Sequence, residues 1–166
     1  MKRSDLVTLV RETFPPIGRP SEITVHGEAC RECSWTSEEL AGERGSLLSQ
    51  DGIRWLLGEL STLSPEGFRW VLPSYLGAIL EDENNDDLGE FLAYHCARVG
   101  GDREVLELHR QLDVLSVPQI RCLIEVLRYV REELGEIFFS DVDAAISNLR
   151  GRAERRAGEA DESGGA

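Results

Sequence analysis

The strongest helix signal in this chain of 166 residues lies at residues 64–79, which read SPEGFRWVLPSYLGAI. Ser64 offers a capping hydroxyl, Pro65 suits the first helical position, and Glu66 places a carboxylate at the positive end of the helix dipole. Apolar residues behind this start recur at helical spacing and predict one buried face: Phe68, Val71, Leu72, Tyr75, Leu76 and Ile79. Because Pro73 removes a backbone donor within this pattern, we expect a kink there, or a break into two short helices.

The same helical spacing continues on both sides of this segment, while strand-like alternation is short and rare. Upstream, we predict a helix from a Ser4 cap to Phe14, a helix over Glu28 to Ala41, and a helix capped by Ser49. Downstream, an apolar stripe with His95 on it predicts another helix, with the members Leu88, Phe91, Leu92, His95 and Val99.

Two further helix starts complete the pattern. Ser116 and Gln119 have the spacing of a capping box, and Ser140 precedes a last apolar stripe. We therefore predict an all-α bundle of seven or eight helices, forming a single domain over residues 1–150, with a disordered polar tail over residues 151–166. A short echo leaves two stacked helical hairpins as an alternative arrangement, since Leu60, Leu63, Ser64 and Arg69 recur as Leu112, Leu115, Ser116 and Arg121.

The charge of the chain indicates which kinds of partner it could bind. Thirty-one Asp and Glu residues against eighteen Lys and Arg residues give a net charge of -13. This charge argues against nucleic acids and anionic membranes and favours a basic protein partner. We predict a non-enzymatic interaction module, immunity- or antitoxin-like, whose partner-binding residues lie in the acidic linker: Glu81, Asp82, Glu83, Asp86 and Asp87.

Large aromatic residues offer a second kind of anchor for a partner, namely Trp35, Trp55, Trp70 and Tyr75. Trp55 and Trp70 lie at the edges of their stripes, which favours a place at the margin of the core with one indole exposed. These residues could therefore either anchor a partner or pack at the margin of the core.

Catalytic and targeting signals are weak. No nucleophile, base and oxyanion donor can be assembled from the sequence, which argues against an enzyme. An enzymatic alternative would need a pocket lined by His95 and a perturbed carboxylate such as Glu90. No apolar run approaches the roughly 20 residues that span a bilayer, and four cysteines are too few for a disulfide scaffold, so we expect a cytoplasmic protein.

His26, Cys30 and Cys33 form the main candidate for a metal site. If a helix begins near residue 27, the three residues share one face at i, i+4 and i+7, and their side chains suit tetrahedral zinc. A fourth ligand would have to come from a distant helix, with the candidates His95, Cys96, His109 and Cys122. The alternatives are ordinary packing of small cysteines beside a solvated histidine, and a redox pair. A zinc-stabilised structural or regulatory module is therefore the alternative function.

Three segments carry a resemblance to a known family. They are residues 19–33, with His26 and the run Cys30-Arg31-Glu32-Cys33, residues 63–76, and residues 115–119. Together they resemble an uncharacterised bacterial family of unknown function over about Val7 to Glu132. The resemblance implies no activity, but it implies that the grouping of His26 with the two cysteines is not accidental. Relatives continue with Glu-His after the second cysteine, where this chain has Ser34-Trp35.

Overall fold

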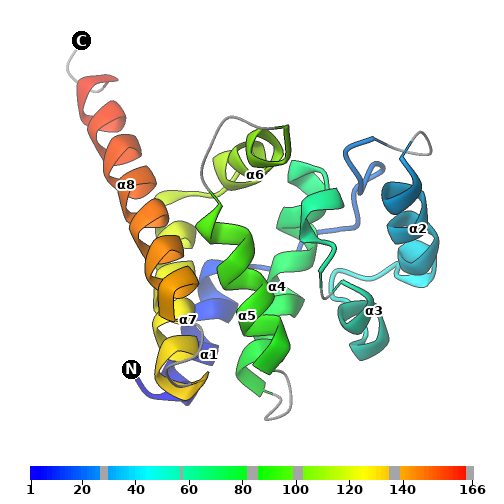
Figure 1. Cartoon of the computed structure of the whole chain (residues 1–166), viewed down its shortest axis with the longest axis horizontal. Helices are drawn as coiled ribbons and strands as arrows, with labels where there is room; N and C mark the ends of the chain where they lie inside the picture. Colours follow the sequence, from blue (N-terminus) through cyan, green and yellow to red (C-terminus); the bar gives the residue numbers. More distant parts are fainter. Residues whose placement is uncertain (27–29, 57, 82–85, 99–102, 135–138, 164–166) are drawn as a thin grey trace.

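The computed structural model describes residues 1–26, 30–56, 58–81, 86–98, 103–134 and 139–163. Within these residues the chain forms eight α-helices and two short 3-10 helices (Figure 1). In chain order they are α1 (Arg3–Thr13), α2 (Arg31–Glu39), η2 (Leu40–Gly42), α3 (Gln50–Trp55), η3 (Leu60–Thr62), α4 (Pro65–Glu81), α5 (Asp86–Ala97), α6 (Arg103–Asp113), α7 (Val117–Leu134) and α8 (Phe139–Ser163). The predicted all-α fold and helix number are confirmed.

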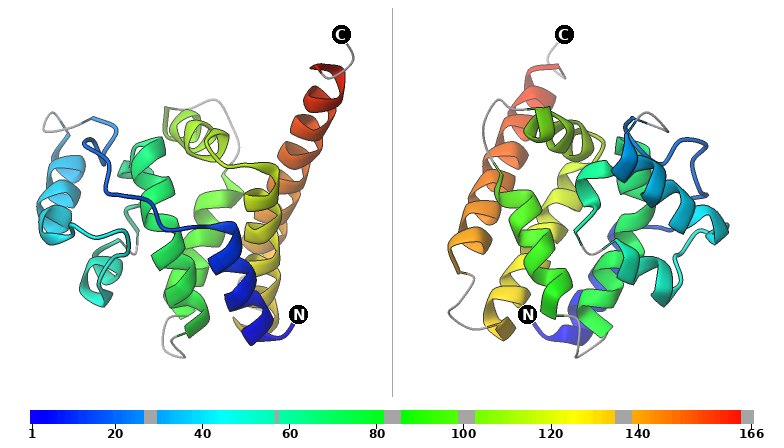
Figure 2. Two further views of the ribbon diagram at one scale, coloured as in Figure 1. Left: turned by 180° about the vertical axis from the view of Figure 1, so that it is seen from behind. Right: turned by 45° about the vertical axis from the view of Figure 1, so that its right-hand side comes forward.

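The helices are arranged around α4 and α5 in the middle of the molecule (Figures 1 and 2). On one side α8 packs against α5 and α7, while α1 contacts α4 and α7. On the other side lie α2 and α3, which contact each other, and α3 also contacts α4. Buried apolar side chains from α1, from α3 to α8 and from the 3-10 helices form one continuous cluster. The segment after α1 crosses the molecule to reach α2, as Figure 2 shows.

α4 begins as predicted, since the Ser64 hydroxyl accepts a hydrogen bond of 2.9 Å from the backbone N–H of Gly67. A break into two helices at Pro73 is wrong, because α4 runs without interruption from Pro65 to Glu81, while the alternative of a kink stays a prediction. Most residues of this helix are buried, including the fully enclosed Trp70 and Tyr75. Burial on almost every side offsets the missing backbone hydrogen bond at the proline.

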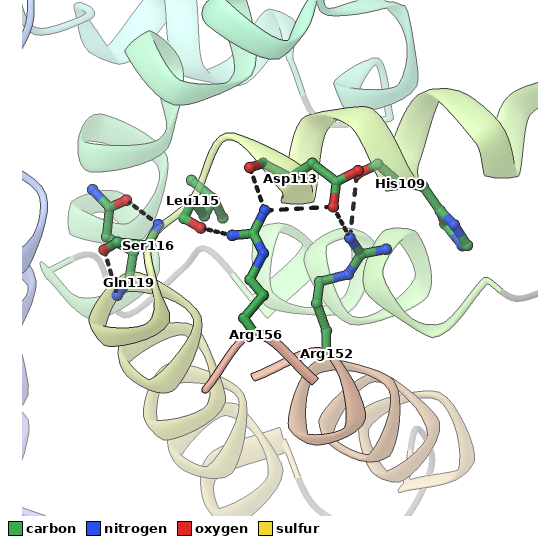
Figure 3. Close-up of polar contacts among 7 residues, drawn as sticks. All are labelled: His109, Asp113, Leu115, Ser116, Gln119, Arg152 and Arg156. Carbon is green, nitrogen blue, oxygen red and sulfur yellow. Dashed lines mark hydrogen bonds and ion pairs between the residues drawn. The ribbon is translucent and has the colours of Figure 1, made fainter. Parts of the chain in front are cut away.

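Two other predicted caps are confirmed. Ser49 caps α3, because its hydroxyl accepts a hydrogen bond of 3.1 Å from the N–H of Gly52. Ser116 and Gln119 form the predicted capping box at α7 (Figure 3). The Ser116 N–H donates to Gln119 Oε1 at 2.9 Å, and the Gln119 N–H donates to Ser116 Oγ at 3.4 Å. Both donors at this helix start are thereby satisfied.

Two predicted caps are wrong. α1 begins at Arg3 with Lys2 at the capping position, so Ser4 lies inside the first turn. α8 begins at Phe139, so Ser140 is likewise helical and is not the cap. In both places a capping residue near the start of an apolar stripe indicated a helix correctly but placed its first residue too late.

The C-terminal tail expected after Gly151 is helical over residues 151–163, where α8 continues. Arg152 is 6% exposed, and its guanidinium pairs with the Asp113 carboxylate. One turn later, Arg156 donates to the carbonyl oxygens of Asp113 and Leu115 (Figure 3). The Asp113 carbonyl stands at the C-terminal end of α6 and the Leu115 carbonyl in the turn that follows, where backbone acceptors lack helical partners and attract cations. The two arginines therefore hold the end of α8 against the turn between α6 and α7.

Replacing Arg152 by methionine is expected to reduce the free energy of unfolding by about 2 kcal/mol, because charged hydrogen bonds to Asp113 and to the His109 carbonyl are lost. Amide hydrogen exchange should rise mainly in α8 beyond Gly151. The exposed Arg155 on the same helix provides the matched control, since Arg155→Met should leave stability and exchange unchanged. Equal effects of the two substitutions would show that Arg152 does not anchor the helix.

Candidate metal site

Residues 22–25 are held against the turn that precedes α4. The Val25 N–H donates to the Thr62 carbonyl at 2.9 Å, and the Ser64 N–H donates to the Ile23 carbonyl at 3.0 Å. The Ser64 hydroxyl also donates to the Glu22 carbonyl at 2.9 Å. These bonds form an isolated antiparallel bridge between Thr24 and Leu63, which fixes the backbone leading directly into His26.

The two cysteines come from the start of α2. Cys30 is the capping residue, with an extended backbone conformation, and Cys33 lies in the first turn. The hydroxyl of Thr36 lies 3.1 Å from the hydroxyl of Thr62, which joins α2 to η3. α2 is therefore positioned by the same short segment that positions His26.

The predicted helix over Glu28 to Ala41 has different bounds. α2 starts at Arg31 and is followed by η2, and residues 27–29 lie outside the described part of the chain. His26 therefore does not share a helical face with the cysteines. Instead, the segment that ends at His26 and the start of α2 meet beside Thr62, and this contact brings the three side chains together.

The spacing of the three ligand atoms fits a tetrahedral ion. One ring nitrogen of His26 and the sulfurs of Cys30 and Cys33 all lie within 4.8 Å of one another. The Cys33 Sγ to His26 Nδ1 distance is 3.5 Å. Zinc bound to sulfur and imidazole in tetrahedral geometry separates its ligand atoms by roughly 3.5–3.8 Å. Small side-chain movements would therefore bring all three residues to zinc-binding distances.

The surroundings of the two thiols differ. Cys33 is 1% exposed, and burial raises the pKa of its thiol. Cys30 is half-buried and donates to the Glu32 carboxylate at 3.2 Å. The pKa of Glu32 is lowered by its own backbone N–H and then by the Cys30 thiol. Because metal binding replaces thiol protons, a cation here would compensate a buried thiolate that is otherwise unfavourable.

No fourth protein ligand joins the cluster among the described residues. The four candidates named from the sequence lie on other helices: His95 and Cys96 on α5, His109 on α6 and Cys122 on α7. His26 and Cys30 are half-buried, so solvent can approach the group from one side. Three protein ligands with a reachable fourth position are the arrangement in which a tetrahedral ion also binds water or an external group.

His95 is a core residue held by an amide. It is 5% exposed, and its Nε2 lies 2.8 Å from Gln111 Oε1. The Gln111 amide nitrogen donates to the carbonyls of Leu60 and Leu63, so its oxygen accepts and His95 Nε2 carries the proton. The histidine on the apolar stripe is therefore a buried core residue whose N–H is satisfied by a side-chain amide.

The chemistry of His95 disfavours the enzymatic alternative. Burial lowers the pKa of His95 to about 4, with a further lowering by Arg98, against an opposing contribution from Gln111. A general base works best with a pKa near the operating pH. A buried imidazole with one nitrogen committed to Gln111 is poorly suited to proton transfer.

The acidic linker predicted to bind a partner is described only in part. Asp82 and Glu83 lie outside the described residues, and of Asp86 the structure describes the backbone at the start of α5. Asp87 is exposed. Glu81 is exposed and forms an ion pair with Arg11 at 2.8 Å. Part of the negative charge at this end of α4 is thus neutralised within the chain.

No protein-family model matches the chain, and no match was found among curated proteins or among solved structures. The resemblance described from the sequence therefore stays a prediction. In the described part of the chain, no helix combines the length and the apolar character that crossing a bilayer requires.

Proposed function

We propose that the chain is a zinc-binding helical module, in which the ion joins the segment ending at His26 to the start of α2. The observation that carries this proposal is the approach of three ligand atoms, from two separate segments, to within 4.8 Å of one another. Soft thiolates and an imidazole select zinc over the harder magnesium and calcium ions. The ion would crosslink two short elements that otherwise meet through a few hydrogen bonds, and its fourth position would hold water or an external group.

The cytoplasm is the compartment that suits this function. All four cysteines are free thiols in the structure. A reducing compartment keeps thiols available to a metal, whereas an oxidising one favours disulfides. The acidic protein-binding role at Glu81 to Asp87 stays a prediction, since its residues are described only in part.

The full chain, purified under reducing conditions without chelator, should contain about one zinc ion per chain. After chelation, adding free zinc to a hundred times the dissociation constant should stabilise the protein by about 2.7 kcal/mol, or about 5–10 °C in Tm. Metal analysis by mass spectrometry and thermal melting measure the two effects.

Cys30→Ser is the informative variant, because Cys30 is half-buried and caps α2 without a side-chain hydrogen bond to the helix backbone. It should lose both the bound zinc and the zinc-dependent rise in Tm. The control is Cys122→Ala on α7, which should bind as much zinc as the unmodified protein even if its own Tm is lower. A wild-type chain that takes up no zinc, or a Cys30→Ser chain that takes up a full equivalent, contradicts the proposal.

A further inference from the structure

Two tryptophans that lie side by side are half exposed to solvent. Trp35 on α2 is 56% exposed and Trp55 at the end of α3 is 52% exposed. Their ring centroids are 6.2 Å apart and the ring planes are inclined by 59°. Trp70, by contrast, is fully buried and donates through its indole nitrogen to the Gly45 carbonyl. The sequence was compatible with two roles for these residues, a partner anchor or a place at the margin of the core. In the structure Trp35 and Trp55 are exposed, whereas Trp70 belongs to the core.

A small cavity of about 90 Å³ is lined by both tryptophans, and we call it the tryptophan notch. Buried leucines from η2 and from the end of α3 also line it, namely Leu40 and Leu56. Two half-buried glutamates complete the lining, Glu39 and Glu59. Because ligand pockets for drug-sized molecules exceed about 300 Å³, the notch has room only for one compact group.

Within the described chain, the glutamates of the notch have no cationic partner, and no cation lies over its tryptophan rings. Among the described residues, neither the Glu39 nor the Glu59 carboxylate makes an ion pair or a side-chain hydrogen bond. The cations of the described chain that lie over aromatic rings are Arg19 at Trp70 and Arg98 at Tyr94, not at the notch. Two tryptophans and two glutamates therefore line a space that no described cation fills.

We infer that the tryptophan notch binds an alkylated ammonium group. Ring faces attract a cation through the aromatic quadrupole, and tryptophan attracts it most strongly. The leucines suit methyl groups, whereas a bare ammonium would need acceptors for its three N–H donors. The hydroxyl of Thr36, which also lines the notch, already donates to the Glu32 carbonyl and contacts Thr62. Methylation removes donors while the positive charge is kept.

The notch is built on positioned elements and is separate from the metal site. α2 is joined to η3 through the Thr36–Thr62 contact, and α3 is capped by Ser49. None of His26, Cys30 and Cys33 lines the notch. Ligand binding in the notch therefore does not require zinc at the metal site. The net charge of -13 further favours accumulation of cations near the surface.

Choline tests this inference against 3,3-dimethylbutanol, which has nearly the same shape without the charge. Titration of the full chain, followed by calorimetry and by tryptophan fluorescence at constant ionic strength, should show saturable binding of choline. The uncharged alcohol should bind at least about tenfold more weakly, because it lacks the cation–π and carboxylate attraction. Equal binding of both compounds, or saturation by neither choline nor a peptide with trimethyllysine, overturns the inference.

Variants at the exposed rings locate the site. Trp35→Ala and Trp55→Ala should each weaken choline binding about tenfold, and Glu59→Gln should weaken it by a smaller factor. Tyr94→Ala is the control, because Tyr94 is a comparably exposed aromatic residue, 54%, on α5 and does not line the notch. Loss of binding in the Tyr94 variant, or full binding in both tryptophan variants, contradicts the assignment.

An alkylated ammonium group could belong to a methylated protein or to a small molecule, and peptide binding distinguishes these two ligands. A trimethyllysine peptide that binds at least about tenfold more tightly than choline, and more tightly than the same peptide with unmodified lysine, identifies a methylated protein partner. A trimethyllysine peptide that binds no better than choline identifies a small quaternary ammonium compound as the ligand. Both outcomes support an alkylated ammonium site, and the first would also provide the basic partner expected from the net charge.

Discussion

Replacing Gly67 by alanine is expected to destabilise the protein by about 3 kcal/mol, although alanine normally favours helices. Gly67 lies in the first turn of α4, where the Ile23 backbone passes directly over it. An added methyl group would overlap the Ile23 carbonyl oxygen and would lie 2.9 Å from the carbonyl carbon. That oxygen accepts the Ser64 N–H, so the segment cannot retreat without breaking the hydrogen bond. The obstacle is backbone, which adjusts less readily than the end of a side chain.

Gly77→Ala is the matched control for Gly67→Ala, since Gly77 is in the same helix and an added methyl group there meets nothing within 4 Å. It should increase the free energy of unfolding by about 0.5–1 kcal/mol through helix propensity. Urea denaturation of both variants measures the difference. If the two glycine variants have equal stability, Ile23 is not packed against α4 as described.

The Gly67 variant also tests the metal site, because residues 22–25 lead directly into His26. Displacing this segment should weaken zinc binding while the two cysteines remain unchanged at the start of α2. Gly77→Ala should bind zinc as the unmodified chain does. A Gly67→Ala chain that folds and retains full zinc affinity would show that His26 is not held by this segment.

Helix existence was predictable wherever an apolar stripe coincided with a local cap. Ser49, Ser64 and the Ser116–Gln119 pair each act within four residues, so short-range sequence is enough to identify them. The repeated Leu-x-x-Leu-Ser pattern also has the same local structure twice. The N–H of the second leucine donates to the carbonyl of the first at 3.3 Å, both at Leu60–Leu63 and at Leu112–Leu115. Whether this reflects two stacked hairpins stays a prediction.

The features that were not predictable depend on contacts between distant residues. α8 beyond Gly151 has no apolar stripe, and it is held by Arg152 and Arg156 on the end of α6. Continuity of α4 through Pro73 depends on burial by neighbouring helices. Neither the acceptors nor the neighbours can be identified from local spacing.

The candidate metal site was predictable in its members but not in its construction. His26, Cys30 and Cys33 attract attention by residue type alone, yet a shared helical face does not bring them together. The bridge between Thr24 and Leu63 does so, across nearly forty residues of sequence. Gln111 was likewise missed, because a lone glutamine on an amphipathic helix has no local signal for a buried role.

Acidification is expected to destabilise the protein strongly through His95. Burial lowers the pKa of this histidine from 6.5 to about 4 in the folded chain. Between these two values the unfolded chain binds a proton at His95 that the folded chain does not bind, so the stability falls as the pH falls. A shift of this size corresponds to about 3 kcal/mol of folding free energy, lost progressively from pH 7 to pH 4.

The difference between the unmodified protein and a His95→Gln variant isolates this effect, because carboxylates that also titrate in this range contribute equally to both. Glutamine can still donate to the Gln111 oxygen but binds no proton. Its free energy of unfolding, measured by urea denaturation at several pH values, should therefore fall by about 3 kcal/mol less than that of the unmodified protein between pH 7 and pH 4. The half-buried His109 on α6 provides the control, and His109→Gln should keep the steep dependence of the unmodified chain. Parallel stability curves for the unmodified and His95→Gln proteins would mean that the pKa of His95 is the same in the folded and unfolded chains, and that burial does not lower it.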